Sequence, residues 1–413
     1  MSISNADIQI LRRLAHEYME CATLPVQKQK RDLWRALNRS QMVRPMVNID
    51  QIPWGEFASA PELACRIADP FWRDYEEGLR RLLYRWNNFP ADMVLEPFLT
   101  IPAAISNSRY GMRPSEETLT DENASAVSSH LYHNQIKDFD DIEKIKDMQI
   151  TLNKEETRER LQVAGHIFDG IPLVSGHGVG FHIGVWDALS MYMGIEDIYF
   201  DIIDRPEFIH ALMDRITNSA LSGIEQANAL GLHDDIASTC HCSYIYTGQL
   251  LPDFGAGRGP VSKNCWAFGM AQLFASASPA TTEEFELPYV SKMAEKFGMV
   301  YYGCCEGLDD RLDIVKRIPN VKKVSCSPWS NRKNFAEKIG DELVMSNKPT
   351  PAYLAVDSLE PEIIKADLEQ TIQLAKANNV NLEFILKDIS TVRNQPGRIG
   401  EWERIAMALV ESW

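Results

Sequence analysis

The segment MVYYGCC, residues 299–305, decides the expected fold, because a short apolar run ends there in a turn that carries two thiols. A helical pattern over residues 282–297 precedes it, and another near 309–318 follows it. The same alternation of short apolar runs with helical patterns continues along the chain from about residue 140. Strands that alternate with helices imply a parallel sheet.

The other candidate strands have the same character and lie at 44–49, 93–98, 171–176, 234–242, 321–327, 342–347 and 381–388. About eight strand units predict an α/β protein with a (β/α)8 barrel, which we place at residues 91–413. Residues 1–90 predict an N-terminal helical extension that packs on the barrel. A doubly wound open sheet is the alternative, although neither GxGxxG nor GxxxxGK[ST] occurs in the chain.

The net charge of −16, from 42 basic and 58 acidic side chains, disfavours binding to nucleic acid or to an anionic membrane surface. No stretch approaches the ~20 apolar residues of a membrane-spanning helix, and the first residues lack the core of a signal peptide. We therefore expect a cytoplasmic protein that binds a small molecule or a protein partner. In that compartment the eight cysteines are expected to be thiols or metal ligands.

In a barrel of this kind the chemistry lies at the carboxyl ends of the strands. The expected ends carry Ser175-Gly176-His177, Cys240-His241-Cys242, Cys304-Cys305-Glu306, Ser325-Cys326-Ser327, Asn347-Lys348-Pro349 and Lys387-Asp388. Zinc binds thiolates, imidazoles and carboxylates, but no CxxC pair is present, so its ligands would come from separate strands. The metal candidates are Cys305, Cys304, His241, Cys242 and Cys326. Burial as small hydrophobic residues is the alternative for each cysteine.

Because neighbouring residues of a strand point to opposite faces, we expect only one of the two adjacent cysteines, Cys305, to face the barrel mouth. The catalytic candidates are Glu306, His177 and His241. Glu306 follows the thiols and has three possible roles: a ligand, a proton carrier, or a cap for the helix that begins near Asp309.

Two loops supply candidates for substrate binding. The glycine-rich turn SGHGVGFHIG allows a ligand to approach the backbone closely around His182, although a histidine bonded within a tight turn is the alternative. The segment 253–272 predicts either a lid that offers cations to an acidic substrate or a plain surface loop. The substrate-binding candidates are His182, Tyr244, Arg258, Lys263, Trp266, Gln272 and Lys348.

The stretch SPATTEEFELPYVSKMAEKFGMVYYGCCEGL, residues 278–308, resembles the uroporphyrinogen decarboxylase superfamily, which includes corrinoid-linked methyltransferases. Ser278-Pro279 and Pro288-Tyr289 fit the pattern, as do VMSNKPTPAYL (344–354), IKDFDDIEKIKD (136–147) and LWRALNRSQMVRPMVNI (33–49). The resemblance implies a (β/α)8 barrel with extra N-terminal helices, and a homodimer.

The departures from this pattern shape the expected function. RPMVNIDQIPW (44–54) does not reproduce the arginine-rich motif with which the decarboxylase binds porphyrinogen carboxylates. The methyltransferases hold zinc with His-x-Cys and a downstream cysteine. Here Cys305 matches that cysteine, Gly303 stands at the histidine, and Cys326 is a loose match downstream.

The resemblance thus implies a zinc-dependent methyltransferase that acts on a methylated small molecule with a separate corrinoid protein as partner. The first alternative is a lyase that decarboxylates a small carboxylic acid, using Arg258, Lys263, Lys348 or Arg393. The second is a non-catalytic protein that binds a small molecule.

Overall fold

The computed structural model describes residues 3–119, 129–176, 178–250 and 259–413. Two candidate residues, His177 and Arg258, lie outside the described residues, as does the part of the expected lid between residues 253 and 258.

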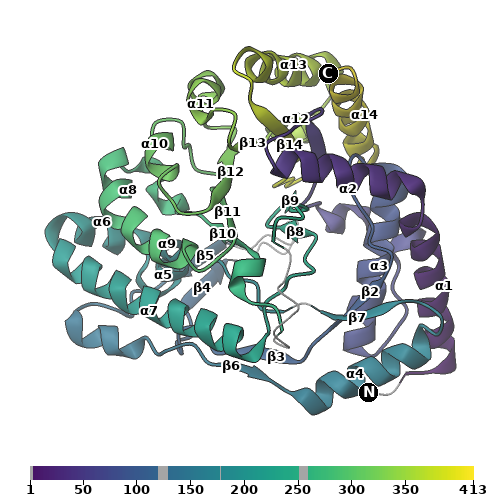
Figure 1. Cartoon of the computed structure of the whole chain (residues 1–413), viewed down its shortest axis with the longest axis horizontal. Helices are drawn as coiled ribbons and strands as arrows, with labels where there is room; N and C mark the ends of the chain where they lie inside the picture. The colour runs from purple at the N-terminus through teal and green to yellow at the C-terminus, as the bar shows by residue number, and fades with distance from the viewer. Residues whose placement is uncertain (1–2, 120–128, 177, 251–258) are drawn as a thin grey trace.

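A six-stranded parallel sheet forms the centre of the fold (Figure 1). Its strands, in spatial order, are β1 (Met46–Ile49), β14 (Asn381–Leu386), β13 (Val344–Asn347), β12 (Val321–Cys326), β11 (Met299–Tyr302) and β10 (Trp266–Gly269). Nearly all residues of these strands are buried, as expected for a parallel sheet covered on both faces. The register pairs Ile49 with Leu386, so the strands end at a common edge.

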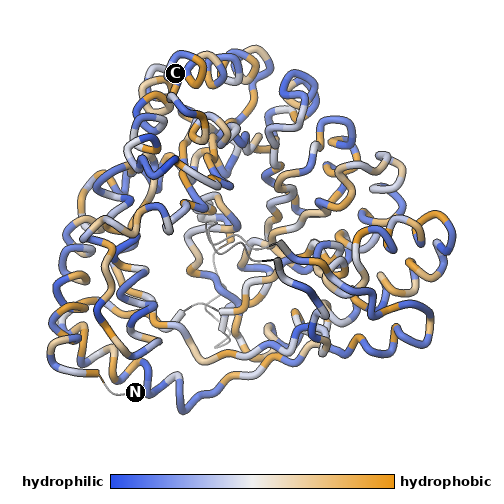
Figure 2. The backbone as a smooth tube through the Cα atoms, turned by 180° about the vertical axis from the view of Figure 1, so that it is seen from behind, coloured by the Kyte–Doolittle hydropathy of each residue, from blue (hydrophilic) through white to orange (hydrophobic). Residues whose placement is uncertain are grey.

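Helices connect successive strands and cover the sheet. They are α8 (Pro279–Phe285), α9 (Leu287–Ala294), α10 (Leu312–Val315), α11 (Arg332–Ile339), α12 (Ala352–Ala355), α13 (Pro361–Ala377) and α14 (Gly397–Glu411). Hydrophobic and hydrophilic residues alternate along these helices, so each buries one side (Figure 2). This alternation of strands and helices confirms the α/β class predicted from the sequence.

The N-terminal helices α1 (Asn5–Ala22) and α3 (Pro70–Asn88) lie side by side along one flank of the molecule, and α2 (Pro25–Asn38) crosses above them (Figure 1). Trp34 and Trp72 are fully buried in a second core beneath them. The Trp34 indole N–H donates to the carbonyl of Asp92 at 2.8 Å, which ties α2 to the chain entering the next strand. The predicted N-terminal helices are therefore present, and β1, which lies among them in the sequence, belongs to the central sheet.

The remaining helices lie between residues 139 and 230. They are a 3-10 helix at Phe139–Lys144, α4 (Lys154–Ile167), α5 (Val185–Met193), α6 (Ile195–Asp204) and α7 (Pro206–Leu230). Two further 3-10 turns, Trp54–Phe57 and Pro61–Leu63, precede α3, and two more flank β10 at Ser262–Asn264 and Gln272–Ser276. No helix of the described residues is long and apolar enough to cross a membrane.

The other described strands form sheets of two strands each. β2 (Leu99–Pro102) runs parallel to β7 (Leu173–Gly176), and β3 (Ile105–Asn107) runs antiparallel to β6 (Ile150–Leu152). Two hairpins follow, β4 (Glu116–Leu119) with β5 (Ser129–Tyr132) and β8 (Thr239–Cys240) with β9 (Ser243–Tyr244). Single parallel pairings join Val179 to His233 and His182 to Phe268. Pairing within the described ranges does not close these pieces into one ring, so the (β/α)8 barrel stays a prediction.

Two expected strands were wrong in detail. Residues 93–98 form no strand because side chains take their backbone N–H groups: Tyr244 binds Val94, Gln27 binds Leu95 and Tyr18 binds Glu96. The strand begins instead at Leu99. The range 234–242 contributes only the short hairpin strand β8.

A third expectation concerned residues 253–272, and it was also wrong in part. A lid or surface loop was predicted there, but residues 266–269 form the edge strand β10 and are buried.

Candidate active site

The chain turns sharply at the carboxyl end of β11, and Gly303 permits that turn. Its φ is +91°, a conformation that residues with a Cβ rarely adopt. A Cβ added there would also lie 2.5 Å from the Leu308 side chain. The glycine therefore lets Cys304, Cys305 and Glu306 follow the strand directly.

The two cysteines belong to a cluster of polar side chains, which we call the thiol cluster: Cys304, Cys305, His241, Lys387 and Asp388. The Cys304 Sγ lies 2.9 Å from the Lys387 Nζ, 3.5 Å from the His241 Nε2 and 3.5 Å from the Cys305 Sγ. Lys387 and Asp388 follow β14, and His241 lies in the turn between β8 and β9. Three chain segments far apart in sequence thus meet at Cys304.

Unusual backbone conformations accompany the cluster. His241 and Asp388 have φ values of +52° and +54°, in the left-handed region that non-glycine residues seldom occupy. Such conformations persist only where the surrounding structure holds them, and they concentrate at functional sites. Their presence next to Cys304 supports a functional role for this edge of the sheet.

The two thiols have opposite acidities. A hydrogen bond from Cys305 lowers the pKa of Cys304 against the effect of burial, and His241 and Lys387 lower it further. The same hydrogen bond, together with burial, raises the pKa of Cys305. The Asp388 carboxylate, 3.3 Å from the Cys305 Sγ, is a second acceptor within reach of the same S–H. Cys304 is thus the thiolate of the pair, and Cys305, which is partly exposed, remains a thiol.

A second set of buried polar groups continues inward from the cluster. Lys348 Nζ lies 3.4 Å from the Cys242 Sγ and donates to Ser346 at 2.7 Å. Although burial opposes it, the charge of Lys348 lowers the pKa of Cys242, and His241 adds to the effect. Deeper still, Lys323 and Glu383 form an ion pair at 2.6 Å with both side chains fully buried.

Carboxyl groups lie on the other side of Cys304. Glu306 is buried and accepts the backbone N–H of Cys304 at 3.0 Å, so it holds the turn that carries the thiol. Burial, and after it the neighbouring Glu306, raises the pKa of Asp187 to about 7. Burial also raises the pKa of Glu286, whose Oε2 finds no hydrogen-bond partner within the described ranges.

A cavity of about 360 Å³ opens beside the cluster. His182, His241, Trp266 and Phe268 line it, and the His241 ring stacks on Phe268 with centroids 4.1 Å apart. Burial lowers the pKa of His182 to about 4, so this imidazole is neutral near pH 7 and its Nδ1 accepts the N–H of Gly184. The cavity therefore presents aromatic rings and a neutral imidazole next to the thiolate.

The other candidates lie apart from Cys304. Tyr244 lines a different cavity, and its hydroxyl bonds the backbone of Val94. Lys263 is exposed and donates to a carbonyl, and the Gln272 backbone N–H donates to Asp187 at 3.4 Å. Cys326 is fully buried in the sheet core, where burial raises its pKa to about 12.

The thiol expected to face inward was Cys305, but the structure puts Cys304 against His241 and Lys387. The strand has already ended at Tyr302, so the alternation of strand faces no longer applies at the cysteines. Lys387 was named at an expected strand end but was assigned no role, although its place directly after an apolar strand was the available signal. Asp187 gave no such signal, because it lies within the helical pattern of α5.

The donor atoms around Cys304 match a zinc site only in their spacing. Tetrahedral zinc places sulfur and nitrogen ligands roughly 3.5–3.8 Å apart, close to the separations around Cys304. However, the Lys387 ammonium already lies against both the Cys304 Sγ and, at 3.1 Å, the His241 Nε2. Within the described ranges, no group of three or more His, Cys, Asp or Glu side chains is placed to hold a metal ion. The arrangement therefore does not fit zinc.

Twenty chains of solved structures are similar to this chain. The chain is similar to a methyltransferase from Methanosarcina mazei, with a TM-score of 0.47 and 14% sequence identity, over 92% of this chain and 97% of the other. No family model and no curated protein sequence matches the chain. The similarity is too distant to bear on the activity, which has to be argued from the site.

Proposed function

We propose that the chain is an enzyme that transfers a methyl group, with the Cys304 sulfur as the nucleophile. The observation that carries the proposal is the contact between Cys304 and Lys387 at 2.9 Å, in a buried site at the edge where the strands end. A thiolate is the reactive form of cysteine, and an adjacent ammonium keeps the sulfur ionised at neutral pH.

The reaction follows from this arrangement. The thiolate attacks the methyl carbon of a donor, the new sulfur–carbon bond forms, and the leaving group departs with the electron pair of the broken bond. Lys387 and His241 balance the charge of the sulfur before attack. The aromatic cavity next to His241 gives the methylated molecule a place to bind.

The finer expectations from the sequence belong to this proposal. We propose that the strands form a (β/α)8 barrel of the uroporphyrinogen decarboxylase type, that a corrinoid protein is the partner in methyl transfer, and that the chain acts as a homodimer. Zinc has no step in this proposal, because the Lys387 ammonium already supplies the positive charge at the sulfur.

The lyase alternative needs cations that face a substrate. Lys263 is exposed, and Arg393 is half-exposed and paired with Asp357 at 2.6 Å. Lys348 is buried, but its ammonium is directed at Cys242, Ser346 and Tyr301. These contacts favour methyl transfer over decarboxylation.

The proposal is tested by trapping the methylated sulfur. Purified protein is incubated with methylcobalamin, and peptide mass spectrometry then locates any added methyl group. We expect it on Cys304 in the wild type and expect it to be lost in Cys304→Ser. Cys21 and Cys65 serve as internal controls, because burial raises the pKa of both thiols. Equal labelling of the three cysteines, or none on Cys304, would contradict the proposal.

A further inference from the structure

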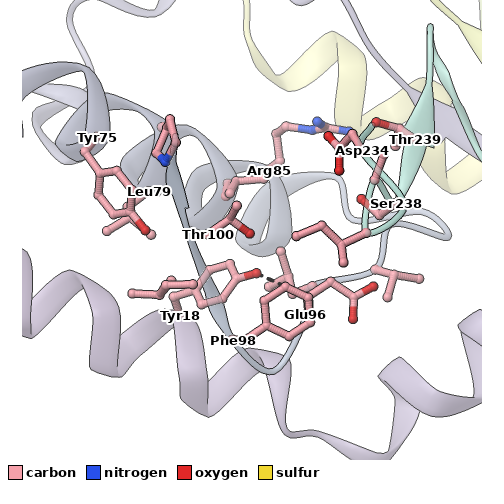
Figure 3. Close-up of a pocket in the computed structure, with 18 of the residues that line it drawn as sticks. Tyr18, Tyr75, Leu79, Arg85, Glu96, Phe98, Thr100, Asp234, Ser238 and Thr239 are labelled. Carbon is pink, nitrogen blue, oxygen red and sulfur yellow. Dashed lines mark hydrogen bonds between the residues drawn. The ribbon is translucent and has the colours of Figure 1, made fainter. Parts of the chain in front are cut away.

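A second and larger cavity, of about 520 Å³, lies between the N-terminal helices and the segment 234–239 (Figure 3). We call it the α3 cavity, because α3 contributes Tyr75, Leu79, Leu82 and Arg85 to its wall. Helix α1 contributes Tyr18, the chain entering β2 contributes Leu95 and Phe98, and β2 itself contributes Thr100. Its volume is typical of sites that bind small organic molecules.

Most of one wall is apolar and aromatic. Tyr75, Leu79, Leu82, Leu95 and Phe98 supply the rings and branched side chains. The Tyr18 hydroxyl accepts the backbone N–H of Glu96 at 3.1 Å, which fixes that ring in the wall. Such a surface favours a ligand with an aromatic or branched aliphatic body, since burying it removes apolar area from water.

Helix α3 also brings Arg85 to the cavity. One of its terminal nitrogens donates to the Ile49 carbonyl at 2.6 Å and approaches the Asn48 Oδ1 at 3.4 Å. Its Nε–H is buried and has no acceptor in the described part of the chain. Arg85 is therefore a cation in the cavity wall that carbonyl oxygens hold in place.

The acidic residues that line the cavity have surroundings of their own. Glu96 is bound by Arg31 at 2.7 Å and by the Tyr246 hydroxyl. Asp74 is exposed at the surface. Asp234 has its own interactions and lies on the same side of the cavity as Arg85 in Figure 3. The Arg85 guanidinium offers an incoming anion the donors that the Ile49 carbonyl does not take.

We propose that the α3 cavity binds an organic carboxylate with an aromatic or branched aliphatic body. The carboxylate accepts hydrogen bonds from the planar guanidinium of Arg85, the geometry that arginine favours for carboxylates. Thr100, Ser238 and Thr239 line the cavity as further polar groups. The body packs on the leucines and aromatic rings of the lining.

The position of the cavity connects this site to the thiol cluster. Arg85 binds the carbonyl of Ile49, which pairs in register with Leu386, the residue before Lys387. Asp234, Ala237 and Thr239 line both the α3 cavity and the smaller cavity that contains His241. A bound carboxylate therefore lies next to the reacting edge, yet its binding does not depend on the reaction proposed for Cys304.

The test compares an acid with its neutral amide on the intact protein. Isothermal titration calorimetry is carried out with 3-phenylpropionate and with 3-phenylpropionamide. We expect the acid to bind at least about tenfold more tightly than the amide, as a charge-assisted pair predicts. Equal affinities, or no binding of either compound, would overturn the proposal, and neither result would bear on methyl transfer.

Variants locate the site. Arg85→Gln is expected to lose the preference for the acid, and Arg85→Lys to keep part of it. Arg81→Gln is the matched control, because Arg81 lies one turn earlier on α3 and pairs with Glu77 at 2.6 Å. Leu79→Trp fills the cavity without changing charge and should abolish binding of both compounds. Unchanged binding in Leu79→Trp would refute the location even if the Arg85 variants fail to fold.

Discussion

Replacing Lys387 with methionine removes the ammonium from Cys304 while keeping a side chain of similar length. Opposite unit charges 2.9 Å apart attract by about 6 kcal/mol at an effective dielectric constant of about 20. At about 1.4 kcal/mol per pH unit, that attraction corresponds to at most about 4 pH units. His241 and Cys305 still stabilise the thiolate in the variant, so we expect the pKa of Cys304 to rise by at least about 2 pH units.

The pKa is read from the pH dependence of alkylation by iodoacetamide, followed by peptide mass spectrometry. The experiment is done in a Cys305→Ser background, which leaves one thiol in the turn and keeps a hydroxyl that can donate to Cys304. Removing a cation destabilises the thiolate, so the alkylation profile should move to higher pH. Lys387→Met should also slow methyl transfer, by about 100-fold or more.

The matched control is Lys348→Met, which removes a neighbouring buried ammonium whose sulfur contact is Cys242 at 3.4 Å. We expect this control to leave the alkylation profile of Cys304 nearly unchanged. If Lys387→Met leaves the profile where it was, or if both variants shift it equally, the assignment of Cys304 as a lysine-stabilised thiolate is refuted.

Three further predictions concern stability and are checked by denaturation. Burial raises the pKa of Asp187 from 3.8 to about 7, so its contribution to stability is full below about pH 4 and is lost as the pH rises to 7. Asp187→Asn should therefore raise the melting temperature at about pH 8 and leave it unchanged below about pH 4. An equal effect at both pH values would refute this explanation. Gly303→Ala should destabilise the fold by about 1–3 kcal/mol, because φ is +91° there, and an unchanged urea midpoint would count against the role of that turn. Lys323→Met should lower the free energy of unfolding by about 3–5 kcal/mol, because it leaves Glu383 buried and unpaired. The double variant Lys323→Met, Glu383→Leu should recover most of the lost free energy. No recovery would contradict the ion-pair explanation.

The central sheet was largely predictable because its strands are short, apolar and bounded by turns. The runs around Val300, Val324 and Phe384 all form strands where the pattern placed them. The failures have a common cause in tertiary hydrogen bonding. Residues 93–98 have strand-like composition, yet side chains from other segments capture their N–H groups, and no local pattern records those partners.

The candidate site was predictable in kind but not in its partners. Thiols and an imidazole after strands indicated Cys304, Cys305 and His241. The choice of Cys304 over Cys305 depends on the turn at Gly303, which changes the direction of the side chains that follow. The position of the Lys387 ammonium depends on the register of β14 against β1 and β13, which the sequence does not display.

The side chains of three lysines are buried: Lys323, Lys348 and Lys387. Among the described carboxylates that contact them, only Glu383 is fully buried. The charge of Lys387 is therefore balanced largely by sulfur, because the Cys304 thiolate lies against its ammonium. Converting Cys304 to a thioether would remove that negative charge and leave the ammonium uncompensated in a poorly polarisable surrounding. The methylated and unmethylated proteins should then differ in their free energy of unfolding. The melting curve of the protein would therefore report the fraction of Cys304 that has been methylated.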